Sequence, residues 1–184
     1  MLSRLQKRKV VDLFYLLDQD RDGAVHWSDL DRIGSYVCLA RGWSRDDDPA
    51  RGLRTAHRLF WQSLLWSIGT TDEGGLRLDA WETHVERMHR AFQEGKRDVA
   101  ARCADAWFQL LDADGDGVVG REDYRAWLLA LGSSANADAA FDRLDADDDG
   151  VLDRGEVRLR WAEWIMADDA DALGNVLATG RLSG

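Results

Sequence analysis

Apolar residues recur along the chain at the spacing of amphipathic helices. Side chains three and four residues apart share one face of a helix, and such faces precede and follow three short acidic segments, residues 18–29, 112–123 and 145–156. The pattern predicts an all-α protein built from helix–loop–helix units. The faces before the acidic segments consist of Val10, Leu13, Phe14 and Leu17, of Cys103, Trp107 and Leu110, and of Ala137, Ala140, Phe141 and Leu144.

The three acidic segments, loops 1, 3 and 4, repeat the motif Asp-x-Asp-x-Asp-Gly in one register. Calcium in proteins takes roughly six to eight oxygen ligands, and such a loop offers carboxylates at positions 1, 3, 5 and 12 and a backbone carbonyl at position 7. Glycine at position 6 permits the positive φ of a sharp turn. Three calcium sites are therefore predicted. Their ligands are Asp18, Asp20, Asp22, Ala24 and Asp29; Asp112, Asp114, Asp116, Val118 and Asp123; and Asp145, Asp147, Asp149, Val151 and Glu156.

One more unit, the second in chain order, is predicted between residues 50 and 93, because the aliphatic residue at position 8 of loop 1 needs a partner loop to form a short two-stranded bridge. We number the four units in chain order. Its loop, loop 2, would be residues 69–80. Positions 1, 3 and 12 are Gly69, Thr71 and Ala80, which leaves Glu73 as the carboxylate ligand. We predict that loop 2 binds no ion. The units then form two pairs, residues 1–94 and 95–184, the second with a C-terminal tail.

Position 12 differs among the three acidic loops. Glu156 is long enough to bind an ion through both oxygens, whereas Asp29 and Asp123 are one methylene group shorter. A single-oxygen ligand favours the octahedral coordination that magnesium requires. We therefore expect Mg²⁺ to compete with Ca²⁺ in loops 1 and 3. Loop 4 should prefer calcium and bind it most tightly, because Asp153 at position 9 offers a further carboxylate.

These loops resemble those of the EF-hand superfamily. The order of acidic and empty loops, the long connection between the first two units and the tail are similar to calerythrin and the bacterial relatives of sarcoplasmic calcium-binding proteins. The resemblance implies a compact two-lobed fold with short β-bridges between paired loops, acting as a cytoplasmic calcium buffer or transporter. Two features depart from the usual pattern, aspartate at position 12 of loops 1 and 3 and His26 at position 9 of loop 1.

Charge narrows the choice of partners. The chain has 34 acidic and 24 basic residues and a formal charge of −10, which repels nucleic acid and anionic lipid and attracts cations. We see no secretory signal and no apolar run long enough to cross a membrane. We expect a cytoplasmic monomer that binds calcium ions, and no nucleic acid or membrane.

The usual enzyme motifs are not supported. Residues 115–120 spell Gly-x-Gly-x-x-Gly, but they lie within loop 3 and follow no strand. His84 and His89 are five residues apart, which is not the spacing that places two metal ligands on one helix face, and we expect both on the surface. We predict that the protein is not an enzyme.

A calcium sensor exposes an adaptable apolar groove, often rich in methionine. The chain has three Met and nine Trp, and most Trp occupy predicted core positions, which favours a buffer. The alternative is a sensor that regulates a target protein.

Residues 168–177 either form a short helix with Leu173, Val176 and Leu177 on one face, filling a groove between the units, or are a frayed tail. Trp43 has no assigned role.

Overall fold

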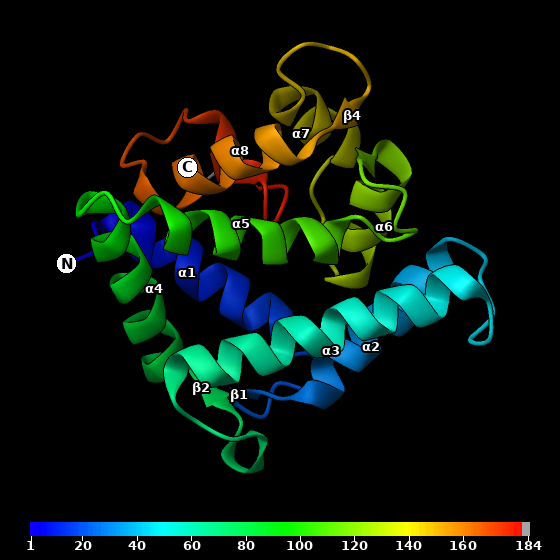
Figure 1. The fold of residues 1–184 in the computed structure, drawn as a ribbon, viewed down its shortest axis with the longest axis horizontal. Coiled ribbons are helices and arrows are strands. Elements are labelled where there is room, and N and C mark those ends of the chain that lie inside the picture. Colours follow the sequence, from blue (N-terminus) through cyan, green and yellow to red (C-terminus); the bar gives the residue numbers. More distant parts are fainter. Residues whose placement is uncertain (182–184) are drawn as a thin grey trace.

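The computed structural model describes residues 1–181, and within them it contains eight α-helices, two 3-10 helices and two small sheets (Figure 1). Residues 182–184, the end of the expected second pair, lie outside the described part. The fold is all-α, as predicted. The elements are α1 (Arg4–Leu17), β1 (Ala24–Val25), α2 (Trp27–Ala40), α3 (Asp48–Ile68), η1 (Asp72–Gly74), β2 (Leu76–Arg77), α4 (Leu78–Gln93), α5 (Arg97–Leu111), β3 (Val119–Gly120), α6 (Arg121–Ala130), α7 (Ala137–Leu144), β4 (Val151–Leu152), α8 (Arg154–Met166) and η2 (Leu173–Val176).

The loops join in antiparallel pairs, each through a two-stranded bridge. Strand β1 pairs with β2 so that Val25 lies opposite Leu76, and β3 pairs with β4 so that Val119 lies opposite Leu152. All four residues are buried, at position 8 of their loops. The helix–loop–helix unit predicted between residues 50 and 93 is thus present as the second unit, and its loop is the partner of loop 1.

The connection between α2 and α3, which the sequence predicted to be long, covers residues 41–47. Helix α3 begins at Asp48 with Pro49 in its first turn. Proline is favoured there because the missing N–H would lack an intrahelical partner and the fixed φ already suits a helix. Helix α3 continues for 21 residues to Gly69, whose φ of 82° ends it in the left-handed conformation.

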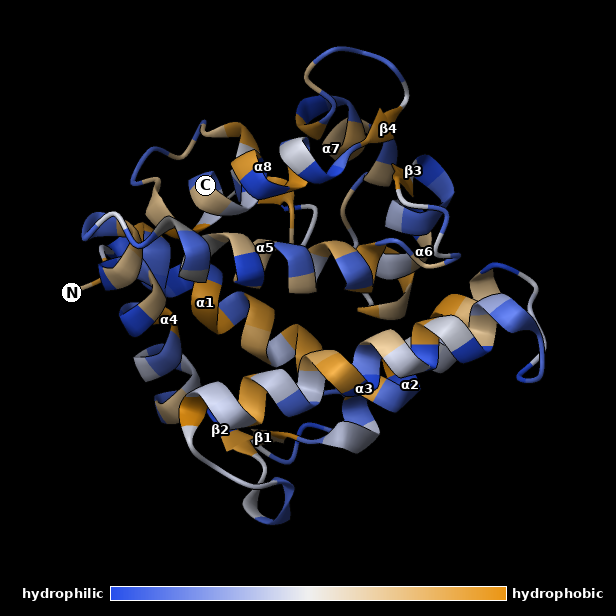
Figure 2. Ribbon diagram, viewed as in Figure 1, coloured by the Kyte–Doolittle hydropathy of each residue, from blue (hydrophilic) through white to orange (hydrophobic). Residues whose placement is uncertain are grey.

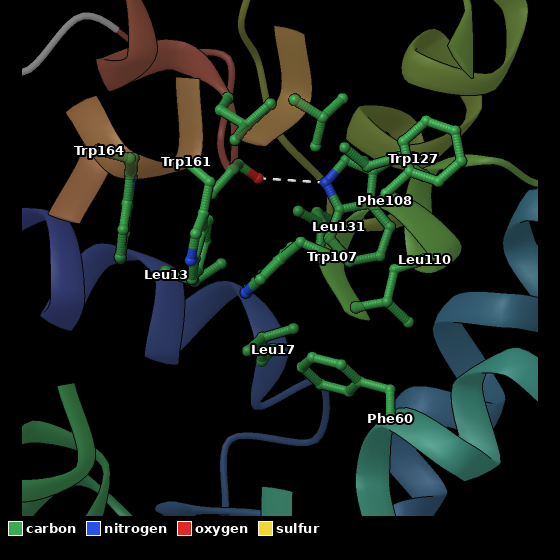
Figure 3. Packing of buried hydrophobic residues seen from close by; sticks show 14 of the residues in the cluster. Leu13, Leu17, Phe60, Trp107, Phe108, Leu110, Trp127, Leu131, Trp161 and Trp164 are labelled. Atoms are coloured by element: carbon green, nitrogen blue, oxygen red, sulfur yellow. Dashed lines mark hydrogen bonds between the residues drawn. The ribbon is translucent and has the colours of Figure 1, made fainter. Parts of the chain in front are cut away.

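One hydrophobic cluster extends through all four units. Tryptophans form its centre (Figure 3): Trp161 lies 4.8 Å from Trp107 and stacks on Trp164 at 5.1 Å, with the ring planes only 8° apart. The expectation that most tryptophans pack in the core is confirmed, although Trp66 is exposed. In Figure 2 apolar residues run in stripes along the helices, while polar residues dominate the connections between α2 and α3 and between α7 and β4.

His84 and His89 are buried, so the expectation that they lie on the surface was wrong. His84 stacks on Trp81 at 6.1 Å and lies 3.4 Å from Ser67 Oγ. His89 Nε2 accepts a hydrogen bond from the side-chain amide of Gln6 at 3.2 Å. Trp81 lies one turn before His84 in α4, whereas Ser67 and Gln6 belong to α3 and α1, so their contacts cannot be read from the spacing of two histidines within α4. Burial lowers the pKa of His84 to about 4.

The C-terminal segment packs against the third and fourth units. Val176, Leu177 and Ala178 are almost completely buried, and η2 contacts α7 and α8. The backbone carbonyl of Val176 accepts from the Tyr124 hydroxyl at 2.5 Å, and that of Ala178 accepts from Trp127 Nε1 at 3.1 Å (dashed in Figure 3). The tail therefore fills a groove and is not frayed, although its helical part is a single 3-10 turn.

Helix α1 is joined to the end of α8 through two buried polar side chains. Gln6 Nε2 donates to the carbonyls of Ile165 and Met166. Lys9 Nζ donates to Trp164 O at 2.6 Å, Ala167 O at 3.2 Å and Asn175 Oδ1 at 2.9 Å. The last carbonyls of a helix lack intrahelical donors, and here the first unit supplies them. Hence the first unit, the fourth unit and the tail are held together.

Candidate metal centres

The backbone of loops 1, 3 and 4 turns as the motif predicts. The glycines at position 6, Gly23, Gly117 and Gly150, have φ of 88°, 95° and 88°. Residues other than glycine rarely adopt this backbone conformation. The amide of each donates to the carboxylate at position 1, at 3.0, 3.2 and 3.0 Å. The sharp turn thereby brings the first carboxylate to the inner side of its loop.

The structure brings three carboxylates together in each of these loops. The groups are Asp18, Asp20 and Asp22; Asp112, Asp114 and Asp116; and Asp145, Asp147 and Glu156, with one oxygen from each residue within 4.8 Å of the others. Position 12 belongs to the group in loop 4 only. The shorter Asp29 and Asp123 lie outside the groups of loops 1 and 3, which is the difference in reach that the extra methylene of glutamate provides.

Position 5 of loop 4 is also outside its group. Asp149 instead accepts from the amide of Val151 at 3.0 Å, and Asp22 and Asp116 accept from the amides of Ala24 and Val118 in the same way. These bonds hold the backbone of each loop at the amide of position 7, the residue whose carbonyl is the predicted backbone ligand.

Asp153, which was expected to add a carboxylate near the ion in loop 4, is the N-cap of α8. Its Oδ1 accepts from the amide of Glu156 at 2.8 Å, and Glu156 Oε2 accepts from the amide of Asp153 at 3.0 Å. This reciprocal pair is a capping box. Asp153 thus positions Glu156, and its own carboxylate is engaged at the helix end.

Burial and mutual repulsion perturb the carboxylates. Desolvation raises the pKa of Asp29, with further contributions from the charges of Asp20 and Asp18. Burial raises the pKa of Asp123 to about 6, and the charges of Asp114 and Asp112 act in the same direction. A divalent cation among these oxygens relieves both effects, because its positive charge favours ionised carboxylates.

The surroundings of two buried carboxylate oxygens indicate whether the loops suit a cation. Asp123 Oδ1 and Asp145 Oδ1 have no hydrogen-bond partner within the described residues. A buried acceptor without a donor is costly unless a cation or water satisfies it. Carboxylate and carbonyl oxygens are the ligands that calcium prefers, so the donor sets of loops 3 and 4 fit this ion.

Loop 2 has a different interior. Its first part forms η1, and Asp72 Oδ1 accepts from Trp61 Nε1 at 3.0 Å, so this carboxylate is held by a core side chain. Glu73 is exposed. Positive φ occurs at Gly75, position 7, where the other loops have it at position 6. Within residues 1–181, the acidic groups close enough to share a metal ion lie in loops 1, 3 and 4.

Arg41 is a site residue that the sequence analysis missed. It follows α2, yet its guanidinium contacts Asp114 and Glu122 of loop 3. The residues are more than 70 positions apart in the chain, and no local motif links them. Composition gave no signal either, because the chain is rich in arginine throughout.

The three acidic loops and the helices that flank them have the arrangement of EF-hand units. A model of an EF-hand domain pair matches residues 1–30, and an EF-hand model matches residues 104–129 and 137–159. The chain therefore carries EF-hand domains, as the loop motif predicted. No curated protein sequence matches the chain significantly.

Solved structures of calcium-binding proteins share the fold. The Ca²⁺-loaded apo form of coelenterazine-binding protein from Renilla muelleri superposes with a TM-score of 0.80 at 17% identity, covering 96% of this chain and 98% of that one. A calcium-binding protein from Streptomyces coelicolor has a TM-score of 0.66 at 21% identity, covering 89% and 99%. The amphioxus sarcoplasmic calcium-binding protein has 0.64 at 17% identity, covering 98% and 100%. The last two agree with the family that the sequence indicated.

Proposed function

We propose that this EF-hand protein is a calcium buffer or transporter that binds three Ca²⁺, one in each of loops 1, 3 and 4, and none in loop 2. The observation that carries the proposal is the coverage of the fourth unit. Its apolar groove is already filled by Val176, Leu177 and Ala178, so a target helix would first have to expel the tail. A buffer needs no such free groove, whereas a sensor does.

The contacts between the units support the same function. Residues 1–94 and 95–184 form two pairs in this proposal, but Lys9 and Gln6 tie the first pair to the last helix and the tail. The stacked tryptophans fill the space between the units with rigid rings, in place of the flexible methionines of adaptable grooves. Ion binding in such a structure should change stability more than shape.

Loops 1 and 3 are proposed to accept Mg²⁺ as well as Ca²⁺. The position of Asp29 and Asp123 outside their carboxylate groups supports single-oxygen coordination, and the inclusion of Glu156 in its group supports bidentate coordination in loop 4.

Among the described residues, none of the helices combines the length and the apolar character needed to cross a membrane. We propose that the protein works in the cytoplasm as a monomer, without an enzymatic role.

Calorimetric titration of the demetallated protein with CaCl₂, with and without MgCl₂, tests the proposal. We expect three bound Ca²⁺, with magnesium weakening two of the binding events. At free calcium a hundredfold above Kd, each site should stabilise the fold by about 2.7 kcal/mol. Absence of stoichiometric calcium binding near neutral pH would refute the function, and a fourth equivalent would refute the assignment of loop 2.

The second candidate is a calcium sensor that binds a target protein. A hollow of about 440 Å³ between α2 and α3 favours it, because the tail does not cover this side. Its walls include Trp27, Leu30 and Trp43, and Leu39 at its edge is highly exposed. The Streptomyces coelicolor neighbour is described in terms of calcium-mediated regulation. A fluorescent apolar dye should brighten little on calcium addition if the protein is a buffer, and strongly if it is a sensor.

A further inference from the structure

Loop 3 contains a positive charge that comes from another unit. Arg41 Nη2 lies 3.0 Å from Asp114 Oδ2 and 3.7 Å from Asp123 Oδ1, and Nη1 lies 2.8 Å from Glu122 Oε2. Asp114 and Asp123 are positions 3 and 12 of the loop, two of its predicted calcium ligands. The guanidinium therefore lies against the carboxylates that the ion would use.

The position of Arg41 is fixed on several sides. Helix α2, which ends immediately before it, packs against α6, the helix that leaves loop 3. The guanidinium lies 5.0 Å from the ring centroid of Trp43, within the range of a cation–π interaction. Its side chain is only 15% exposed. These features distinguish the contact from a mobile surface ion pair.

Loops 1 and 4 show how position 12 is bound without such a cation. In loop 1 Asp29 accepts from the amides of Gln19 and His26, at 3.1 and 2.8 Å. In loop 4 Glu156 accepts from the amides of Ala146 and Asp153, at 2.8 and 3.0 Å. In both, the amides at positions 2 and 9 close the loop around the carboxylate.

Loop 3 is closed on one side only. Asp123 Oδ2 accepts from the amide of Gly120 at position 9, at 3.1 Å. Oδ1 has no hydrogen-bond partner in the described structure, so the bond from position 2 is missing, and this oxygen faces Arg41. Arg41 thus stands near the carboxylate oxygen that the loop's own backbone leaves unbonded.

We infer that Arg41 is an intramolecular competitor of calcium at loop 3 and sets the affinity of this site below that of an otherwise equal loop. The inference rests on the proposed function, in which loop 3 binds calcium. Either Arg41 leaves Asp114 and Asp123 when the ion binds, and its ion pairs are lost, or it stays and repels the ion. Both routes weaken binding, and both link calcium in the second pair of units to a residue of the first.

A movement of Arg41 would also change the contacts of the connection between α2 and α3. If Arg41 moves away from loop 3, its partner Trp43 loses the cation at its ring face. Trp43 lines the hollow between α2 and α3, so its environment should change when loop 3 is loaded.

The three glycines at position 6 allow each loop to be followed separately in the full-length protein. The amides of Gly23, Gly117 and Gly150 each donate to a position 1 carboxylate, and their NMR signals in ¹⁵N-glycine-labelled protein should shift as each loop fills. In Arg41→Gln we expect the midpoint of the Gly117 shift to move to roughly tenfold lower calcium, a typical size for coupling between sites. The midpoints of Gly23 and Gly150 should stay unchanged.

Arg125→Gln is the matched control. It removes the same charge from α6, two residues beyond loop 3, where Arg125 pairs with Asp138 at 2.7 Å and forms no ion pair with a predicted ligand among the described residues. We expect its Gly117 midpoint to remain at the wild-type value. Arg41→Lys keeps the charge without the planar fork and should give an intermediate value. Thermal unfolding of each variant checks that it is folded.

Salt gives a measurement on the wild type alone. Ions screen the attraction between calcium and carboxylates in every loop, but in loop 3 they also screen the competing Arg41. Rising KCl should therefore shift the Gly117 midpoint less than the Gly150 midpoint. Equal salt shifts, or an unchanged Gly117 midpoint in folded Arg41→Gln, would overturn the inference, as would an equal gain in Arg125→Gln. If Gly117 responds to calcium in none of the proteins, loop 3 is not a calcium site and the proposed function itself fails.

Discussion

Replacing Gly174 by alanine tests how the tail is docked. A Cβ at this position would lie 2.2 Å from the carbonyl oxygen of Arg160 and 2.7 Å from Glu163 Cβ, both in α8. A backbone carbonyl cannot swing aside as a flexible side chain can, so the tail must shift away from α8. The residues that follow, Val176 to Ala178, would lose their contacts with the fourth unit.

The size of the effect can be worked from what the tail buries. Burial of Val176 and Leu177 contributes about 3 to 6 kcal/mol, and the bonds from Tyr124 and Trp127 add about 1 to 3 kcal/mol. Ordering three residues costs about 3 to 6 kcal/mol. The expected net loss in unfolding free energy is about 2 kcal/mol, which for a chain of this size lowers Tm by about 4 to 8 °C.

Gly52→Ala is the matched control. Gly52 lies within α3, is exposed, and has no atom within 4 Å of its added Cβ. Alanine there should stabilise the protein by about 0.5 to 1 kcal/mol, because it restricts the unfolded chain and favours the helix. The two substitutions should thus have opposite signs in thermal and urea unfolding. A Gly174→Ala protein as stable as the wild type would refute the proposed docking.

Three further predictions concern charge and metal. Burial lowers the pKa of His57 from its ordinary value of 6.5 to about 4. Between these values only the unfolded form binds the proton, so the stability of the wild type falls as pH falls through this range. The unfolding free energy of His57→Asn should therefore fall by about 2 kcal/mol less than that of the wild type between pH 7 and 5, measured by urea unfolding. Parallel pH profiles would contradict this. Lys9→Met should destabilise the protein by about 2 kcal/mol, because it leaves three acceptors without their charged donor. Lys7 is exposed, and Lys7→Met should leave the stability unchanged. Similar unfolding curves for the two variants would exclude the role given to Lys9. Glu156→Gln should weaken one of three calcium-binding events in calorimetry, while Ala80→Glu should add none; four equivalents in the latter would show that loop 2 needs only position 12.

The loops could be predicted because all that defines them is local. A glycine at position 6 and carboxylates at alternating positions act within twelve residues, and the aliphatic residue at position 8 demands a second loop nearby. The partner loop, residues 69–80, was predicted because Val25 at position 8 of loop 1 needs a partner, although positions 1, 3 and 12 of that loop carry no carboxylate. Helix faces followed from apolar spacing for the same reason.

What the sequence left open depends on contacts between distant residues. Arg41 meets loop 3 because α2 packs on α6, and His84 is buried because α3 and α5 close over α4. Gly174 permits close approach of the tail to α8, and no local pattern around it indicates this role. In each case the sequence gives the residue type but not the residues that it contacts in the fold.

The parallel stack of Trp161 on Trp164 has an optical consequence. Two indoles held face to face at 5.1 Å interact through their transition dipoles, so the pair should give a coupled signal in circular dichroism that a lone indole does not. Both rings belong to α8, and Lys9 and the tail hold the end of that helix in place. The amplitude of this signal should therefore report, without any added label, whether the interior of the protein is assembled.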